Sequence, residues 1–133
     1  MQNLKVYLIT VVVIFLVDIL WLGFISKNLY KKYLGDLMAP NVNWTAAIVF
    51  YLLFIAGLVF FVINPAIEKE SLRYALLVGG FFGLITYSTY DLTNLSTLKD
   101  WPINITIIDI IWGPILNSAT AAITFLVANR FIK

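Results

Sequence analysis

The class of fold is decided by the segment WTAAIVFYLLFIAGLVFFVIN, residues 44–64. This segment is almost entirely apolar and lies inside a longer run, residues 37–67, that contains no charged side chain. About 20 consecutive apolar residues are enough for an α-helix to cross the hydrocarbon core of a membrane. We therefore predict that residues 44–64 span a bilayer.

Three further segments have the same character, and they cover residues 6–26, 72–95 and 103–129. We expect Pro65 to end the second helix, because proline cannot donate a backbone hydrogen bond inside a helix. The last two links are short, which predicts that the helices they join are antiparallel. The predicted fold is all-α, an integral membrane bundle of four transmembrane helices in up-down-up-down order, with residues 1–133 forming a single transmembrane domain.

The longest connection, residues 27–43, has a pattern of its own. Tyr30, Tyr33 and neighbouring leucines recur at helical spacing between lysines. This pattern predicts either a short interfacial helix between helices 1 and 2 or a continuation of the first span. Gly35 weakens such a helix, and we expect Pro40 to end it.

The composition restricts both the class of protein and the chemistry that it can perform. Hydrophobic residues make up 62% and charged residues 12% of the chain, against about 45–50% and about 25% in soluble domains. The chain has no cysteine and no histidine, which excludes thiol nucleophiles, disulfides, and thiolate or imidazole metal ligands. A net charge of +2 without a dense basic cluster argues against nucleic acid as a partner. Membrane lipids are the partner that the composition predicts.

The orientation in the membrane depends on a small difference in positive charge. The predicted topology places five of the nine lysine and arginine residues on the side of the termini and four on the other side. Because cytoplasmic loops carry the excess of positive charge, this favours termini in the cytoplasm.

Small residues form a stripe along the third predicted helix, at Ala75, Gly79 and Gly83. Small residues at four-residue steps let helix backbones approach closely in lipid. We expect this stripe to pack against a neighbouring helix. A homo-oligomer formed through Ala75, Gly79 and Gly83 is the alternative.

Three aspartates lie inside the predicted spans, at Asp18, Asp91 and Asp109. A carboxyl group near the centre of a membrane costs about 2.5–3.5 kcal/mol on insertion scales, so all three should face the interior of the bundle. Counting from the nearest charged residue at 1.5 Å per residue places each aspartate roughly 12–14 Å from the same membrane face. The sequence therefore predicts one layer of aspartates, in the half of the bilayer away from the termini.

Each aspartate has a polar or aromatic residue three or four positions away on its own helix, and side chains at this spacing lie on the same face of a helix. An aspartate followed by tryptophan at the third position occurs twice, in DILWLG and in DIIWGP. The two strings are either related in function or coincidental. The neighbours that we include as candidate ligand-binding residues are Trp21, Tyr87, Asn94 and Trp112.

Pro114 follows Gly113 within the fourth predicted helix. It should kink that helix and free backbone carbonyl groups close to Asp109. Asn117, one turn further along, is another candidate ligand-binding residue. The two interpretations are an unwound polar pocket and an ordinary proline kink.

The aspartates themselves have a structural and a functional interpretation. In the first, uncharged carboxyl groups form hydrogen bonds between helices, and such bonds average only about 0.6 kcal/mol in membranes. Because this gain is small against the cost of insertion, we favour a functional site. If a metal binds, Asp18, Asp91 and Asp109 are the predicted ligands, since hard cations such as Mg²⁺ take oxygen ligands. The residues identify no cofactor and no catalytic residue.

Taken together, the strings DILWLG, YDLTNL, TLKDWP and DIIWG resemble a family of small bacterial membrane proteins catalogued as domain of unknown function 2177. The resemblance covers essentially the whole chain. It implies a four-helix, multi-pass protein of the bacterial cytoplasmic (inner) membrane. It carries over no catalytic residue.

Three functions fit these observations. The first is a protein that binds or handles a lipid or another apolar small molecule, with the aspartates as polar anchors or as acid and base. The second is a proton- or cation-coupled transporter that acts as an oligomer, because intramembrane carboxyl groups commonly carry protons. The third is an assembly subunit of a larger membrane complex. We favour the first, and the sequence does not decide whether the protein is an enzyme.

Overall fold

The computed structural model describes residues 2–21, 23, 28–38, 40–41 and 43–132. These residues are almost all helical, and the described part of the chain contains no β-strand. The elements, in chain order, are α1 (Gln2–Leu20), α2 (Leu29–Leu34), the 3₁₀ turn η2 (Gly35–Leu37), α3 (Trp44–Leu58), the π-helical turn η3 (Val59–Ile63), α4 (Asn64–Glu68), α5 (Leu72–Thr97) and α6 (Ile103–Phe131).

Four helical segments are long and apolar enough to cross a membrane: Gln2–Leu20, Trp44–Glu68, Leu72–Thr97 and Ile103–Phe131. This confirms the all-α class and the four predicted spans. The first span begins earlier than predicted because Gln2 and the residues after it are good helix formers. Of its predicted last turn, residues 22 and 24–27 lie outside the described residues.

The second span corrects the prediction that Pro65 ends the helix. The chain stays helical from α3 through η3 into α4, and Pro65 lies in the first turn of α4. Proline is tolerated there, because the first turn of a helix needs no donor from that residue. The wider π turn immediately before Asn64 provides the local break in hydrogen bonding that the prediction assigned to the proline.

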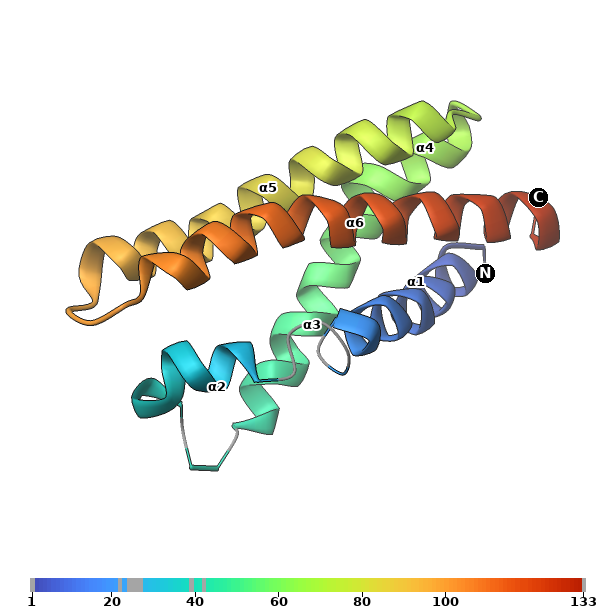
Figure 1. The fold of residues 1–133 in the computed structure, drawn as a ribbon. Coiled ribbons are helices and arrows are strands. Elements are labelled where there is room, and N and C mark those ends of the chain that lie inside the picture. The colour runs from blue at the N-terminus through green and yellow to red at the C-terminus, as the bar shows by residue number, and fades with distance from the viewer. Residues whose placement is uncertain (1, 22, 24–27, 39, 42, 133) are drawn as a thin grey trace.

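The core of the fold is the antiparallel pair α5 and α6, which lie side by side along most of their length (Figure 1). Helix α1 packs along the C-terminal half of α6, and α3 crosses the pair at a wide angle in this view. The two termini lie at the same end of the bundle. The predicted up-down-up-down order across a membrane is compatible with this arrangement and stays a prediction.

The outer surface explains why this bundle needs a membrane. Large apolar side chains are widely exposed on all four long segments, and Leu53 of α3 is 69% exposed. Aggregation would follow in water, because monomeric soluble proteins rarely expose large contiguous apolar patches. The chain is therefore a multi-pass membrane protein, with lipid tails covering these side chains.

The stripe of small residues faces α6 of the same chain. Ala75, Gly79 and Gly83 are all buried. A Cβ atom on Gly79 would lie 3.0 Å from the Ala121 Cβ, and one on Gly83 would overlap the Gly113 carbonyl oxygen. The predicted packing role is correct. The stripe leaves no free surface for a second copy, so a homo-oligomer, which stays a prediction, would need another face.

Helix α6 continues without interruption from Ile103 to Phe131 and contains Pro114 in its interior. Of the two interpretations of this segment, the unwound polar pocket is therefore wrong, because the backbone stays helical through Pro114. Asn117 donates from Nδ2 to the Gly113 carbonyl oxygen over 2.9 Å, which satisfies a backbone acceptor in the turn that contains the proline. The carbonyl group that Pro114 leaves without its helical donor is that of Ile110, so this bond does not replace the one that the proline removes.

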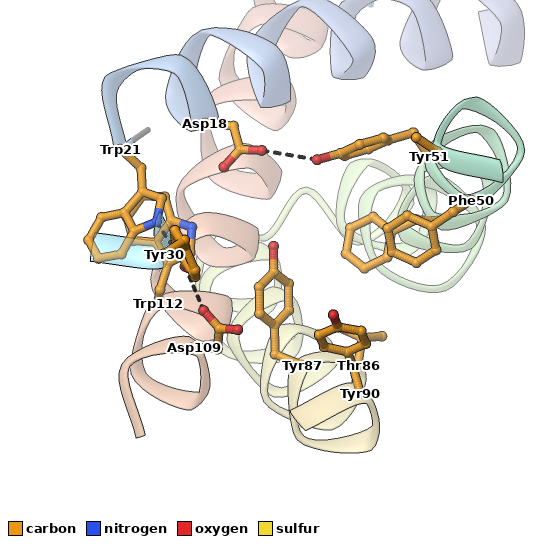
Figure 2. Close-up of a pocket in the computed structure, with 12 residues that line it drawn as sticks. Asp18, Trp21, Tyr30, Phe50, Tyr51, Thr86, Tyr87, Tyr90, Asp109 and Trp112 are labelled. Atoms are coloured by element: carbon orange, nitrogen blue, oxygen red, sulfur yellow. Dashed lines mark hydrogen bonds between the residues drawn. The ribbon is translucent and has the colours of Figure 1, made fainter. Parts of the chain in front are cut away.

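The predicted short helix between the first two spans exists as α2, and it changes to a 3₁₀ turn at Gly35, where we expected weakness. Tyr30 of α2 reaches Asp109 of α6 (Figure 2). The link is therefore folded against the bundle. Its depth relative to the membrane surface stays a prediction.

Candidate functional site

A cavity of about 410 Å³ opens between the helices. All five of α1, α2, α3, α5 and α6 contribute to its wall, together with the residue that follows α1. The wall is mostly aromatic and contains two carboxyl groups (Figure 2). The lining residues are Asp18, Trp21, Tyr30, Ala47, Phe50, Tyr51, Phe54, Thr86, Tyr87, Tyr90, Asp109 and Trp112.

One side of the cavity carries a chain of hydrogen bonds that ends on Asp109. The Trp21 indole Nε1 donates to the Tyr30 hydroxyl over 3.2 Å. Tyr30 in turn donates to Asp109 Oδ1 over 2.6 Å, a length typical of a hydroxyl that donates to a carboxylate. Burial and the neighbouring Asp109 carboxylate raise the pKa of Tyr30 above its usual range, so this hydroxyl keeps its proton and remains a donor.

The second carboxyl group, Asp18, lies near the end of α1. It accepts a hydrogen bond from the Tyr51 hydroxyl of α3 over 3.3 Å. Trp112 of α6 lies close enough to interact with Asp18, yet its buried indole Nε1 has no hydrogen-bond partner. This donor has the Asp18 carboxyl group as a neighbouring acceptor, without a hydrogen bond of regular geometry.

The two aspartate-tryptophan strings of the sequence meet at this site. Trp21 and Trp112 stack face to face, with ring centroids 4.3 Å apart and an interplanar angle of 12°. Each tryptophan connects to the aspartate of the other string: Trp21 donates to Tyr30, which donates to Asp109, and Trp112 interacts with Asp18. The repetition in the sequence is therefore related in space, because it joins α1 to α6.

Asp91 of α5 is fully buried, and neither of its carboxyl oxygens has a hydrogen-bond partner. It lies beside Asp109, with which it interacts electrostatically. Asp91 does not line the cavity. It is therefore a buried neighbour of Asp109 and not a third acidic group of the cavity wall.

Close packing of α5 against α6 places Tyr87 in the cavity. Gly113 of α6 lies under this side chain, and a Cβ atom there would lie 2.6 Å from the Tyr87 Cγ and 2.8 Å from the Gly83 carbonyl oxygen. Only glycine leaves room for this approach. The Tyr87 ring consequently points into the space between Asp18 and Asp109 (Figure 2).

Comparison with known proteins gives one finding. The sequence model of a family described as predicted membrane protein (DUF2177) matches residues 3–126. The chain belongs to the DUF2177 family. No curated protein and no solved structure matches this DUF2177 protein. The family is that of the sequence resemblance, and its description agrees with the exposed apolar surface of the bundle.

Most of the predicted site residues of this DUF2177 protein lie together. Asp18 and Asp109 line one cavity, and the lining also includes Trp21, Tyr87 and Trp112. The remaining candidates, Asp91, Asn94 and Asn117, do not line it.

Asn94 and Asn117 were included for their polarity and spacing. Asn94 lies one turn beyond Asp91 on α5 and is partly buried. Asn117 is buried against Gly113, in the interface of α5 with α6. The polarity of a side chain in a membrane helix therefore does not distinguish a residue of the site from a residue of a helix interface.

Other lining residues were missed by the sequence-based prediction, above all Tyr30 and Tyr51. Each donates a hydrogen bond to an aspartate from a different segment of the chain. For Tyr30 the only signal was the presence of tyrosines at helical spacing in residues 27–43, and Tyr51 had no comparable signal within the apolar run of residues 44–64. Residue spacing within one helix carries no information about partners that other segments supply.

The chemistry available to the DUF2177 site is limited. No group of three or more Asp, Glu, His or Cys side chains in the described part of the chain could hold a metal ion, so the three aspartates do not form the metal site considered from the sequence. The hydroxyl of Thr86, a lining residue, already donates to the Phe82 carbonyl oxygen of its own helix over 2.9 Å. The remaining groups are carboxyls, phenols and indoles, which bind by hydrogen bonding and exchange protons.

Proposed function

We propose that this membrane protein binds an amphiphilic molecule, a lipid or another largely apolar compound, in the cavity between its helices. The bacterial inner membrane is the proposed location, with the termini in the cytoplasm. The carrying observation is the aromatic cavity of about 410 Å³ with two carboxyl groups in its wall. Ligand sites in proteins are typically about 300–1,000 Å³, mostly apolar, with a few converging polar groups.

The distribution of polarity in the wall supports an amphiphile in particular. Phe50, Phe54 and Ala47 of α3 provide an apolar side, while Asp18 and Asp109 provide the polar side. A molecule with a polar head and an apolar body satisfies both at once. A purely polar solute would leave the aromatic surface uncovered, and a hydrocarbon would leave the carboxylate oxygens unsolvated.

A cavity-filling substitution tests this proposal. Ala47→Phe places a ring into the cavity while leaving every polar lining group in place, so it should displace the ligand by volume alone. Ala56→Phe is the matched control, because Ala56 belongs to the same helix but is exposed and does not line the cavity. Native mass spectrometry of the purified proteins should find a defined amphiphile on wild type and on the Ala56 variant, and none on Ala47→Phe.

Two results would count against binding in this cavity. One is a wild-type protein that retains no amphiphile and gains none when lipid is added. The other is an Ala47→Phe variant that is folded by circular dichroism and holds the same molecule in the same amount as wild type.

Proton- or cation-coupled transport is the second candidate, and it is favoured by Asp91. A buried carboxyl group without hydrogen-bond partners, placed beside a second carboxyl at a cavity wall, is an arrangement that suits a proton carrier. Proteoliposomes distinguish the two functions. A transporter moves its substrate only under a pH or ion gradient and stops when Asp91 is replaced by asparagine, whereas a binding protein retains its ligand without a gradient.

A further inference from the structure

Among the described residues, the wall of the cavity carries two acidic side chains and no basic one. Asp18 and Asp109 both line it, and the lining contains no lysine or arginine. Each carboxyl group accepts one hydrogen bond from a tyrosine, while a carboxylate offers about four acceptor positions. Buried charges in proteins are normally paired with an opposite charge or with several donors. A positively charged head group on the ligand would pair with these carboxyl groups.

The aromatic part of the wall suits a positive charge as well. The rings of Phe50, Tyr51 and Phe54 come from α3, and those of Tyr87 and Tyr90 come from α5. Figure 2 shows the rings of Phe50, Tyr51, Tyr87 and Tyr90 beside the two carboxyl groups, and Phe54 lines the same cavity. The faces of aromatic rings attract cations, and aromatic cages recognise ammonium groups by this means.

The indole donor of Trp112 adds a requirement for the ligand. This side chain is only 9% exposed, its indole Nε1 has no hydrogen-bond partner, and it lines the cavity. A buried donor without a well-formed hydrogen bond is unfavourable. An acceptor oxygen on the ligand, close to its positive group, would provide that bond.

We propose that the ligand is an amphiphile whose head group carries an ammonium with a neighbouring oxygen. The ammonium lies between Asp18 and Asp109 within the ring of aromatic side chains, and the oxygen accepts from Trp112. This assignment rests on the proposed function, since it specifies the head group of the molecule that the cavity binds. Aminolipids and free long-chain amines share this chemistry.

Chain-matched probes separate the charge of the head group from the apolar tail. Dodecylammonium, dodecyltrimethylammonium and dodecanol have the same tail, and their binding is followed by native mass spectrometry and by intrinsic tryptophan fluorescence, to which Trp21 and Trp112 of the cavity wall contribute. Both ammonium probes should bind about tenfold more tightly than dodecanol, given the strength of charge-assisted and cation–π contacts. Phosphatidylethanolamine beside phosphatidylglycerol with the same acyl chains then shows whether a lipid or a free amine is preferred.

Two substitutions locate the effect. Asp18→Asn and Asp109→Asn should each reduce ammonium binding about tenfold and leave dodecanol binding unchanged. Asp100→Asn is the matched control, because Asp100 is exposed in the link before α6. The comparison of probes on wild type needs no variant, so it is informative even if one variant does not fold.

Equal binding of dodecanol and dodecylammonium to wild type would overturn the ammonium assignment and leave the proposed function standing. Loss of dodecanol binding in both asparagine variants would also overturn it, because the carboxyl groups would then shape the cavity rather than recognise charge. Absence of binding for every probe and lipid would remove the proposed function together with the assignment.

Discussion

The two sides of this bundle are built in opposite ways. Where α5 meets α6, the backbones are so close that Gly83 and Gly113 have no room for a single additional carbon atom. Where α1, α2 and α3 face that pair, aromatic side chains surround about 410 Å³ of open space. One chain therefore contains a tightly packed interface and a hollow one, within the same four spans.

The two sides therefore have different roles: the α5–α6 pair supports the site, and the side formed by α1, α2 and α3 completes the cavity around the ligand. The close-packed pair provides Asp109, Trp112 and Tyr87 from a rigid base, because glycine contacts fix the distance between the two backbones. The other side provides Tyr30 and Tyr51, which reach the aspartates through single hydrogen bonds. We expect substitutions in the packed interface to affect stability, and substitutions around the cavity to affect mainly binding and local order.

The largest expected effect on stability follows from substitution of Gly83. Gly83→Ala places a methyl group against the Gly113 carbonyl oxygen and should lower the free energy of unfolding by about 3 kcal/mol, the upper range for overpacking. Gly80→Ala is the matched control on the same helix, because its Cβ would lie 3.8 Å from the Ser118 Cβ, an ordinary contact. Unfolding in a detergent titration measures both. Similar losses in the two variants would show that the interface is looser than described.

An intermediate effect is expected for Tyr30. Tyr30→Phe removes the 2.6 Å hydrogen bond to Asp109 and the acceptor for Trp21, so α2 should separate from α6 at a cost of about 1.5 kcal/mol. Tyr33→Phe, one turn along the same short helix, should change little. Hydrogen exchange of residues 29–34 is the measurement. Unchanged protection in Tyr30→Phe would mean that other contacts hold α2 in place.

The smallest effect is expected for Tyr51, whose hydrogen bond to Asp18 is longer, at 3.3 Å. Tyr51→Phe should lower the free energy of unfolding by about 0.5 kcal/mol, close to the average for hydrogen bonds between membrane helices. The same detergent titration compares it with Tyr30→Phe. A loss larger than that of Tyr30→Phe would reverse the order of the two tyrosine contacts.

The fold was largely predictable because the membrane simplifies the problem. A run such as residues 44–64 must be helical, since lipid provides no partners for backbone groups. The starts of α3 and α6 were predicted correctly at Trp44 and Ile103. The prediction for Pro65 was wrong because a proline ends a helix only where its missing N–H is needed for a backbone hydrogen bond. Here the π turn η3 comes directly before α4, and Pro65 lies in the first turn of α4, where that N–H is not needed.

The candidate site was predictable only in part. The cost of a carboxyl group in lipid singled out Asp18 and Asp109, and both line the cavity. The same argument included Asp91, which is buried beside Asp109 and does not line the cavity, and the depth count could not separate them because it measures position along the membrane normal only. Asn117 has the same polarity as a site residue, but it serves the α5–α6 interface.

By itself, the sequence determined the number of membrane spans, the family, and the presence of acidic side chains that must face the interior. These follow from the composition and spacing of each segment, on which the lipid solvent acts locally. Only the tertiary structure decided that Trp21 stacks on Trp112, that Tyr30 and Tyr51 reach the aspartates, and that a cavity separates them. Those contacts join residues far apart in the chain, and they depend on how the helices pack against one another.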